Sequence, residues 1–192
     1  MKLVLATGSR HKLREFGVLV APHVLEPLAD GIDLGPEIGL TFAENALGKA
    51  VVAARAIGAP AIGDDSGIQA DALGGAPGIY SRRYAGETAT DAENLAKLIR
   101  EAPAGSGLAY VCALAFVDPG TGEEIVFEGR CTGRMSDTPR GEGGFGYDPV
   151  FIPDDGRGGL TMAELSDAEK HAISHRGRAV RALLAWLDSS GR

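Results

Sequence analysis

Two adjacent carboxylates, Asp64 and Asp65, follow the short apolar run 60–63 and precede Ser66 and Gly67. We expect both to lie in a turn at the end of a strand. Neighbouring carboxylates repel each other unless water or a cation neutralises them, and Mg²⁺ prefers oxygen ligands of this kind. The segment therefore indicates a metal site at a strand end, and an Asx turn exposed to solvent is the alternative.

A second candidate site lies near the N-terminus, where residues 2–6 predict a buried strand and 10–20 a helix. The residues at this junction are Thr7, Gly8, Ser9, Arg10, His11 and Lys12. The N-terminus of a helix offers unpaired N–H groups and a favourable dipole to an anion, and Lys12 adds an ammonium group. The junction predicts a phosphate site, although its spacing is neither that of a P-loop nor that of a Rossmann turn. An ordinary helix cap at Ser9 is the alternative.

Glu37 stands in a Gly/Pro loop ahead of the segment that carries Lys49. If the fold brings Glu37 beside Asp65, two carboxylates from separate segments can bind Mg²⁺ together with waters and substrate oxygens. Lys49 would then neutralise a phosphate. A solvated acid in a loop is the alternative for Glu37.

The third candidate segment is the glycine-rich loop around Phe145, which also contains Asp148. An aromatic ring between glycines can take the flat face of a base, and a carboxylate can accept from ring N–H groups. Near the C-terminus, Lys170, His175 and Arg176 offer mainly donors, which suits a keto-purine or a phosphate. The alternatives are a Phe that fills the core and basic residues on a solvated surface.

Several elements must position these residues. The T-x-x-E patterns beginning at Thr41 and Thr90 and the S-x-x-E pattern beginning at Ser166 predict capping boxes and helices. The runs 108–117 and 124–131 flank a Pro/Gly turn and predict a β-hairpin. Parallel β-α units combined with a hairpin predict a mixed α/β fold with helices over an open twisted sheet, in a single domain over residues 1–192.

Composition narrows the class of protein. The formal net charge of −7 argues against a surface that binds nucleic acid through many phosphates. No stretch of about 18 apolar residues occurs, so we expect neither a membrane span nor a membrane partner. We expect a cytoplasmic protein. Cys112 and Cys131 lie in or after apolar runs and are interpreted as small core residues.

Taken together, six blocks in order along the chain resemble the inosine triphosphate pyrophosphatase family, the non-canonical purine NTP pyrophosphatases also called RdgB/HAM1-like. The blocks begin at Thr7, Leu40, Asp64, Gly74, Gly144 and Ser174. The resemblance implies an elongated mixed β-sheet flanked by helices, with the active-site cleft between two lobes, and a homodimer. It also implies Mg²⁺-dependent hydrolysis of XTP, ITP and dITP to the monophosphate and pyrophosphate, which cleans the nucleotide pool.

The same resemblance implies roles for individual residues. Asp65 would be the catalytic acid that binds the metal and activates water, and Glu37 would share the metal. The triphosphate would be held by Lys49 and by Thr7, Gly8, Ser9, Arg10, His11 and Lys12, with Ser66 contacting the substrate. The base would be bound by Phe145, Gly146, Tyr147, Asp148, Lys170, His175 and Arg176.

The chain departs from the family pattern at two of these positions. Ser9 stands where the family usually has Asn, so a longer amide is replaced by a hydroxyl. Pro36 stands where relatives often have an acid, so metal binding in that loop depends on Glu37.

Three other functions compete with this one. A Maf-like enzyme would act on modified pyrimidine triphosphates, a regulator would bind nucleotide without turnover, and a nucleic-acid-binding module would show salt-dependent binding to DNA.

Overall fold

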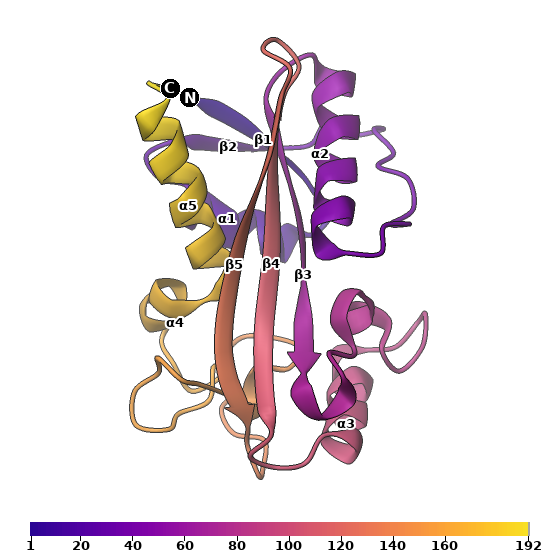
Figure 1. Ribbon diagram of the computed structural model, residues 1–192, viewed down its shortest axis with the longest axis vertical. Helices are drawn as coiled ribbons and strands as arrows, with labels where there is room; N and C mark the ends of the chain where they lie inside the picture. Colours follow the sequence, from indigo (N-terminus) through magenta and orange to yellow (C-terminus); the bar gives the residue numbers. More distant parts are fainter. Residues whose placement is uncertain (192) are drawn as a thin grey trace. The chain divides into compact units, whose positions relative to one another are not determined.

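The computed structural model describes residues 1–191 and shows an α/β protein (Figure 1). The strands are β1 (Lys2–Ala6), β2 (Val24–Pro27), β3 (Ala61–Ala70), β4 (Gly107–Asp118), β5 (Glu123–Met135) and β6 (Phe151–Pro153). The α-helices are α1 (Arg10–Leu19), α2 (Phe42–Ile57), α3 (Asp91–Glu101), α4 (Asp167–Ile173) and α5 (His175–Ser189). Short 3-10 helices span Asp71–Leu73, Gly78–Arg83 and Asp148–Val150.

The six strands form one sheet in the order β2-β1-β3-β4-β5-β6. Strand β1 pairs in parallel with β2 and β3, whereas β5 and β6 are antiparallel, so the sheet is mixed as the sequence predicts. The predicted hairpin is also confirmed, because β4 and β5 are neighbours joined by a short turn that the Gly122 N–H closes onto the Asp118 carbonyl at 2.8 Å. Strand β2 has no counterpart among the elements expected from sequence.

The predicted capping boxes are present at two of the three helices. At Thr90 and Ser166 the cap hydroxyl accepts from the N–H of the Glu three residues later. The side chain of that Glu accepts in turn from the backbone N–H of the cap residue. At Thr41 only the first half forms, because the Glu44 carboxylate accepts from the Leu40 N–H instead. Helix α2 still begins at the predicted place and ends at Gly58, whose left-handed backbone (φ 64°) suits glycine.

The chain divides into two compact units. Within residues 1–191, unit 1 comprises 1–66, 112–129 and 176–191, and unit 2 comprises 67–111 and 130–175. Each unit has its own hydrophobic core, and Cys112 and Cys131 are fully buried in the cores of units 1 and 2, as predicted. Burial raises the pKa of the Cys112 thiol to about 12, so it stays protonated as a core residue. The single domain expected from sequence stays a prediction.

In unit 1 the strands carry helices on both sides, with α2 on one and α1 and α5 on the other (Figure 1). The contact between β3 and α2 is unusually close at Gly63. A Cβ atom built there would lie 2.4 Å from the Ala46 carbonyl oxygen and 2.7 Å from the Ala50 nitrogen, both in α2. Glycine at 63 therefore lets the helix backbone lie directly against the strand. Among residues 1–191, no helix combines the length and the apolar character needed to cross a membrane.

Candidate active site

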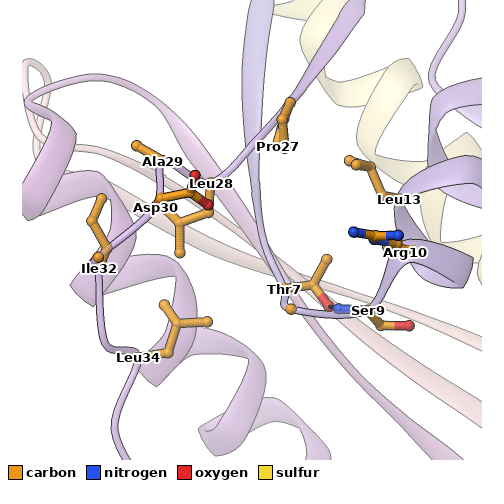
Figure 2. Close-up of a pocket in the computed structure, with 12 residues that line it drawn as sticks. Thr7, Ser9, Arg10, Leu13, Pro27, Leu28, Ala29, Asp30, Ile32 and Leu34 are labelled. Carbon is orange, nitrogen blue, oxygen red and sulfur yellow. Dashed lines mark hydrogen bonds between the residues drawn. The ribbon is translucent and has the colours of Figure 1, made fainter.

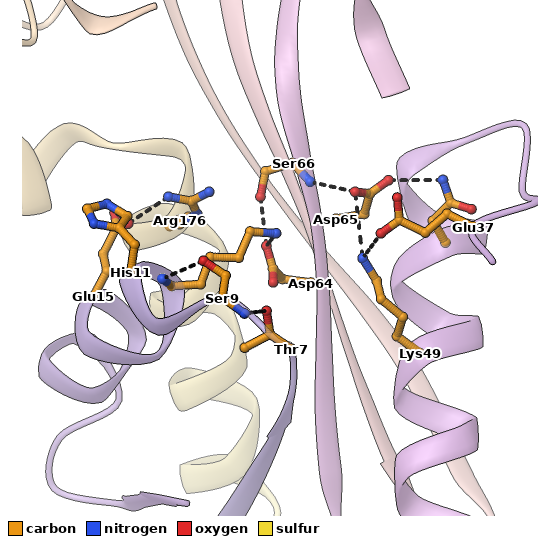
Figure 3. Close-up of polar contacts among 12 residues, drawn as sticks. Thr7, Ser9, His11, Glu15, Glu37, Lys49, Asp64, Asp65, Ser66 and Arg176 are labelled. Atoms are coloured by element: carbon orange, nitrogen blue, oxygen red, sulfur yellow. Dashed lines mark hydrogen bonds and ion pairs between the residues drawn. The ribbon is translucent and has the colours of Figure 1, made fainter. Parts of the chain in front are cut away.

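The two adjacent aspartates lie inside β3, and the predicted turn at this place is wrong. Strand β1 ends at Ala6, opposite Gly63, but β3 continues to Ala70 with β4 as its other neighbour. Because successive side chains of a strand point to opposite faces, Asp64 and Asp65 are separated by the sheet itself. Asp64 faces α1 and Asp65 faces α2 (Figure 3). Each carboxylate therefore has its own set of partners, and their mutual repulsion does not require a shared cation.

Asp64 pairs with Lys12, which lies in the first turn of α1, after the turn that joins β1 to α1. The Lys12 ammonium lies 2.7 Å from Asp64 Oδ2, and the Ser66 hydroxyl donates to the same oxygen at 2.9 Å. Burial acts to raise the pKa of Asp64, but the charges of Lys12, Arg176 and Lys49 outweigh burial and lower this pKa to about 2. Asp64 is thus a permanent anion that anchors Lys12.

The first turn itself has the structure expected for a helix N-terminus. The Ser9 side chain caps α1 by accepting from the Lys12 N–H at 3.3 Å, and the Ser9 N–H donates to the Thr7 hydroxyl at 3.1 Å. Serine at position 9 therefore serves as the cap in this structure. Arg10 and His11 follow in the first turn of α1, and the His11 ring lies 3.8 Å from the Glu15 carboxylate.

A pocket of about 460 Å³ adjoins this turn in unit 1 (Figure 2). It is lined by Thr7, Gly8, Ser9, Arg10, Leu13, Pro27, Leu28, Ala29, Asp30, Gly31, Ile32 and Leu34. Four of the residues predicted to hold phosphate thus face one cavity, opposite the loop 28–34.

Arg176 belongs to unit 1, as does the turn 7–12 between β1 and α1, whereas the other residues predicted to bind the base belong to unit 2. Its guanidinium donates to Glu15 Oε2 at 2.6 Å, and both side chains are buried. Burial acts to lower the pKa of Arg176, but the charges of Glu15 and Asp64 raise it above its ordinary value. Glu15 was not among the residues predicted from sequence; its position one helical turn after His11, on the buried side of α1, is the signal that points to it.

Asp65 contacts α2 on the other face of β3. Its Oδ2 accepts from the Asn45 side-chain amide at 3.0 Å, and its Oδ1 accepts from the Ser66 N–H at 3.1 Å. The Lys49 ammonium lies 3.7 Å from Oδ1. Burial raises the pKa of Asp65 above its ordinary value, although Lys49 and the Asn45 hydrogen bond act to lower it. Asn45 lies in the block that begins at Leu40, but its contact with Asp65 was not predicted from sequence.

Glu37 reaches the same ammonium from its loop. Lys49 Nζ lies 2.6 Å from Glu37 Oε1, so Glu37 and Asp65 share the Lys49 ammonium as a partner, and metal binding by the two carboxylates stays a prediction (Figure 3). No group of three or more His, Cys, Asp or Glu residues suited to a metal occurs within residues 1–191. Mg²⁺ needs only one or two carboxylates, because waters and substrate phosphates complete its octahedron. The Glu37–Asp65 pair, one member partly exposed, fits that ion.

The predicted base-binding residues gather in unit 2, apart from Arg176. Asp148 is buried and accepts from the Tyr110 hydroxyl at 2.9 Å, from Lys170 Nζ at 2.5 Å and from the Phe145 N–H at 3.0 Å. The ring of His175 stacks on Tyr110, with centroids 4.8 Å apart. Tyr110 is a further residue that sequence analysis missed, because it lies within a uniformly apolar strand.

The loop around Phe145 presents its ring to solvent. Phe145 is 38% exposed, and Lys170 Nζ lies 5.2 Å from its ring centroid. Gly144 and Gly146 have positive φ of 75° and 59°, and a Cβ at Gly144 would lie 2.1 Å from Asp148 Oδ2. Tyr147 points inward, and its hydroxyl donates to the Ser81 carbonyl at 2.6 Å, so this hydrogen bond holds the loop to the core.

These features define a class: an α/β protein with an open mixed sheet, whose strand β3 carries two aspartates that each pair with a lysine, next to the Ser9-capped N-terminus of α1. A model of the Ham1 family matches residues 3–186. The chain belongs to the Ham1 family.

Curated relatives match along nearly the whole chain. The dITP/XTP pyrophosphatase of Photorhabdus laumondii is 47% identical over 201 residues, covering 98% of this chain and 99% of that protein. The dITP/XTP pyrophosphatase of Escherichia coli O157:H7 is 47% identical over 198 residues, covering 97% and 98%.

Solved structures agree with the fold. A HAM1 protein from Coxiella burnetii superposes with a TM-score of 0.88 at 36% identity, covering 98% of this chain and 99% of that one. A nucleoside-triphosphatase named dITP/XTP pyrophosphatase from Mycobacterium abscessus has a TM-score of 0.75 at 42% identity, covering 96% and 99%.

Proposed function

We propose that this protein is a nucleoside triphosphate pyrophosphatase that hydrolyses non-canonical purine nucleotides, dITP, XTP and ITP, to the monophosphate and pyrophosphate. The names of the curated relatives support the reaction. The observation that carries the proposal is Asp65, a buried carboxylate with a raised pKa that is held between Asn45 and Lys49.

In this proposal Asp65 accepts the proton of the water that attacks the α-phosphorus. The Asn45 amide and the Ser66 N–H orient its two oxygens. Lys12 and Lys49 bind the oxygens of the triphosphate and stabilise the charge that develops on the pyrophosphate leaving group. Thr7, Gly8, Ser9, Arg10 and His11 would add N–H and side-chain donors at the α1 N-terminus.

We propose Mg²⁺ as the cofactor, held by Glu37 and Asp65. When bound, the ion would supply the positive charge that screens the polyphosphate. The donor set of two carboxylate oxygens supports this assignment.

The unit 2 residues are proposed to select the base. The exposed Phe145 ring offers a stacking face, and Lys170 and His175 can donate to the O6 acceptor of hypoxanthine or xanthine. Adenine carries a donor at that position and would leave a buried donor unpaired, which costs up to roughly 10⁴-fold in discrimination. Arg176 pairs with Glu15 on α1, so we propose that it acts near the phosphate-binding residues 7–12 and does not contact the base. A homodimer, a cytoplasmic location and a role in cleaning the nucleotide pool complete the proposal.

The test is pyrophosphate release from XTP, ITP, dITP, GTP, ATP and UTP, each with Mg²⁺ and with EDTA. We expect release only from the first three and only with the metal. Preference for pyrimidine triphosphates would replace the proposal with a Maf-like activity. Tight ITP binding without release would replace it with a regulator.

A further inference from the structure

Lys49 occupies the centre of the carboxylate pair that is proposed to bind the metal. Its Nζ lies 2.6 Å from Glu37 Oε1 and 3.7 Å from Asp65 Oδ1 (Figure 3). The side chains of Lys49 and Asp65 are only 11% and 9% exposed. Charges this close and this shielded from water interact far more strongly than an ion pair at the surface.

We infer that Lys49 is the resident counter-ion of the Glu37–Asp65 pair and that it competes with a divalent cation for these carboxylates. When the cation binds, the ammonium is released and becomes available to the triphosphate. This inference rests on the proposed metal site, and it adds that the metal and the phosphate-binding lysine are coupled.

The position of Lys49 makes such a movement possible. Its Cα lies in the interior of α2, which is fixed against β3 at Gly63, whereas the ammonium is carried on a flexible four-carbon stem. Both ion pairs that Lys49 forms within the described residues go to Glu37 and Asp65. A cation bound there would therefore remove both partners of Lys49 at once.

The opposite face of β3 supplies a matched control. Lys12 also pairs with an aspartate, at 2.7 Å from Asp64 Oδ2, and it belongs to the same unit. Lys12 pairs with Asp64, whereas Glu37 and Asp65 pair with Lys49. Replacing Lys12 thus removes one positive charge close to the site without removing the competitor.

The experiment is calorimetric titration of Mg²⁺ into the nucleotide-free protein. We expect Lys49→Met to bind Mg²⁺ more tightly than the unaltered protein, on the order of tenfold. Lys49→Arg, which retains the charge, should remain near the unaltered protein, and Lys12→Met should gain much less than Lys49→Met. Thermal unfolding gives a second readout: Lys49→Met should be less stable in EDTA and should gain more from Mg²⁺ than the unaltered protein does.

Equal Mg²⁺ affinity in Lys49→Met and the unaltered protein would overturn the inference, as would an equal gain in Lys12→Met. Folding of Lys49→Met only in Mg²⁺ would support it. If that variant folds in neither buffer, Lys49→Gln replaces it in the same titration.

Two further variants separate this inference from the proposed function. If the unaltered protein binds no Mg²⁺, or if Glu37→Gln and Asp65→Asn bind it undiminished, the metal site itself is wrong. If those two variants lose Mg²⁺ binding while Lys49→Met is unchanged, only the competition is wrong.

Discussion

Asp64 and Asp65 are chemically identical and adjacent, yet their surroundings move their pKa values in opposite directions. Asp64 meets Lys12 on the α1 side of β3, and its pKa falls to about 2. Asp65 meets Asn45 and the more distant Lys49 on the α2 side, and burial raises its pKa. The first is suited to anchor a cation and the second to accept a proton.

The role of Asp65 predicts the effect of its conservative replacement. Asp65→Asn keeps the size of the side chain but cannot accept a proton, so kcat for ITP should fall by at least about 10²-fold. The circular dichroism spectrum and melting temperature should show an intact fold. Turnover of ITP at the unaltered rate would remove Asp65 from the catalytic role.

Asp64 predicts a change in stability with pH. Because its pKa is lowered from 3.8 to about 2 in the folded protein, the stabilisation is complete above the unfolded value and is lost as the pH falls from 3.8 towards 2. The shift corresponds to about 2 kcal/mol. We expect Asp64→Asn to be less stable than the unaltered protein in urea at pH 6, and this difference to shrink below about pH 4.

The control for this prediction is Asp154→Asn, since Asp154 is exposed. That variant should match the unaltered protein at both pH values. A difference for Asp64→Asn that stays constant from pH 6 to 3 would contradict the assignment of the shift to Asp64.

At the scale of elements, the site depends on how closely α2 approaches β3. Asn45 and Lys49 lie on α2 one turn apart, and both reach Asp65 because Gly63 leaves no side chain between the strand and the helix. Helix and strand therefore act as one scaffold for the acid site.

This contact predicts that Gly63→Ala is destabilising. Its Cβ would lie 2.4 Å from the Ala46 carbonyl oxygen, so the helix must move, at a cost of roughly 1–3 kcal/mol. Displacement of α2 should also lower kcat, because Asn45 and Lys49 move with it. Urea unfolding and ITP turnover measure the two effects.

Gly48→Ala is the matched control within α2. No atom lies within 4 Å of a Cβ built at Gly48, and alanine favours helix over glycine by roughly 1 kcal/mol. Gly48→Ala should therefore be as stable as the unaltered protein or more so. A Gly63→Ala variant of unchanged stability would show that the approach of α2 is not tight.

At the scale of the whole molecule, the chain has two hydrophobic cores, one in each unit. Strands β3, β4 and β5 each contribute residues to both units. Because three continuous strands are shared, we expect the units to unfold together, as the predicted single domain requires.

Truncation of each core tests this expectation. Leu183→Ala in unit 1 and Phe151→Ala in unit 2 each remove a fully buried side chain and should cost about 2–5 kcal/mol. Both should shift one common unfolding transition monitored by fluorescence and circular dichroism. Two separate transitions, each sensitive to one variant, would contradict a single domain.

The sequence by itself determined the local elements and the candidate residues. Cap residues such as Thr90 and Ser166 and the turn after Asp118 act over a few residues, so their patterns predicted the helices and the hairpin. The family resemblance likewise implied roles for Asp65, which lies in the block that begins at Asp64, and for Glu37 and Lys49, and these roles stay predictions.

Only the tertiary structure decided how those residues are combined. The end of β3 depends on hydrogen bonding to β4, a strand some forty positions further on, so Asp64 and Asp65 stand in a strand where local chemistry predicted a turn. Because successive side chains of a strand alternate between the two faces of the sheet, Asp64 and Asp65 point in opposite directions. The meeting of Glu37, Lys49 and Asp65, and the pairing of Glu15 with Arg176, also join residues distant in sequence. Contacts of this kind follow from packing, which no local pattern encodes.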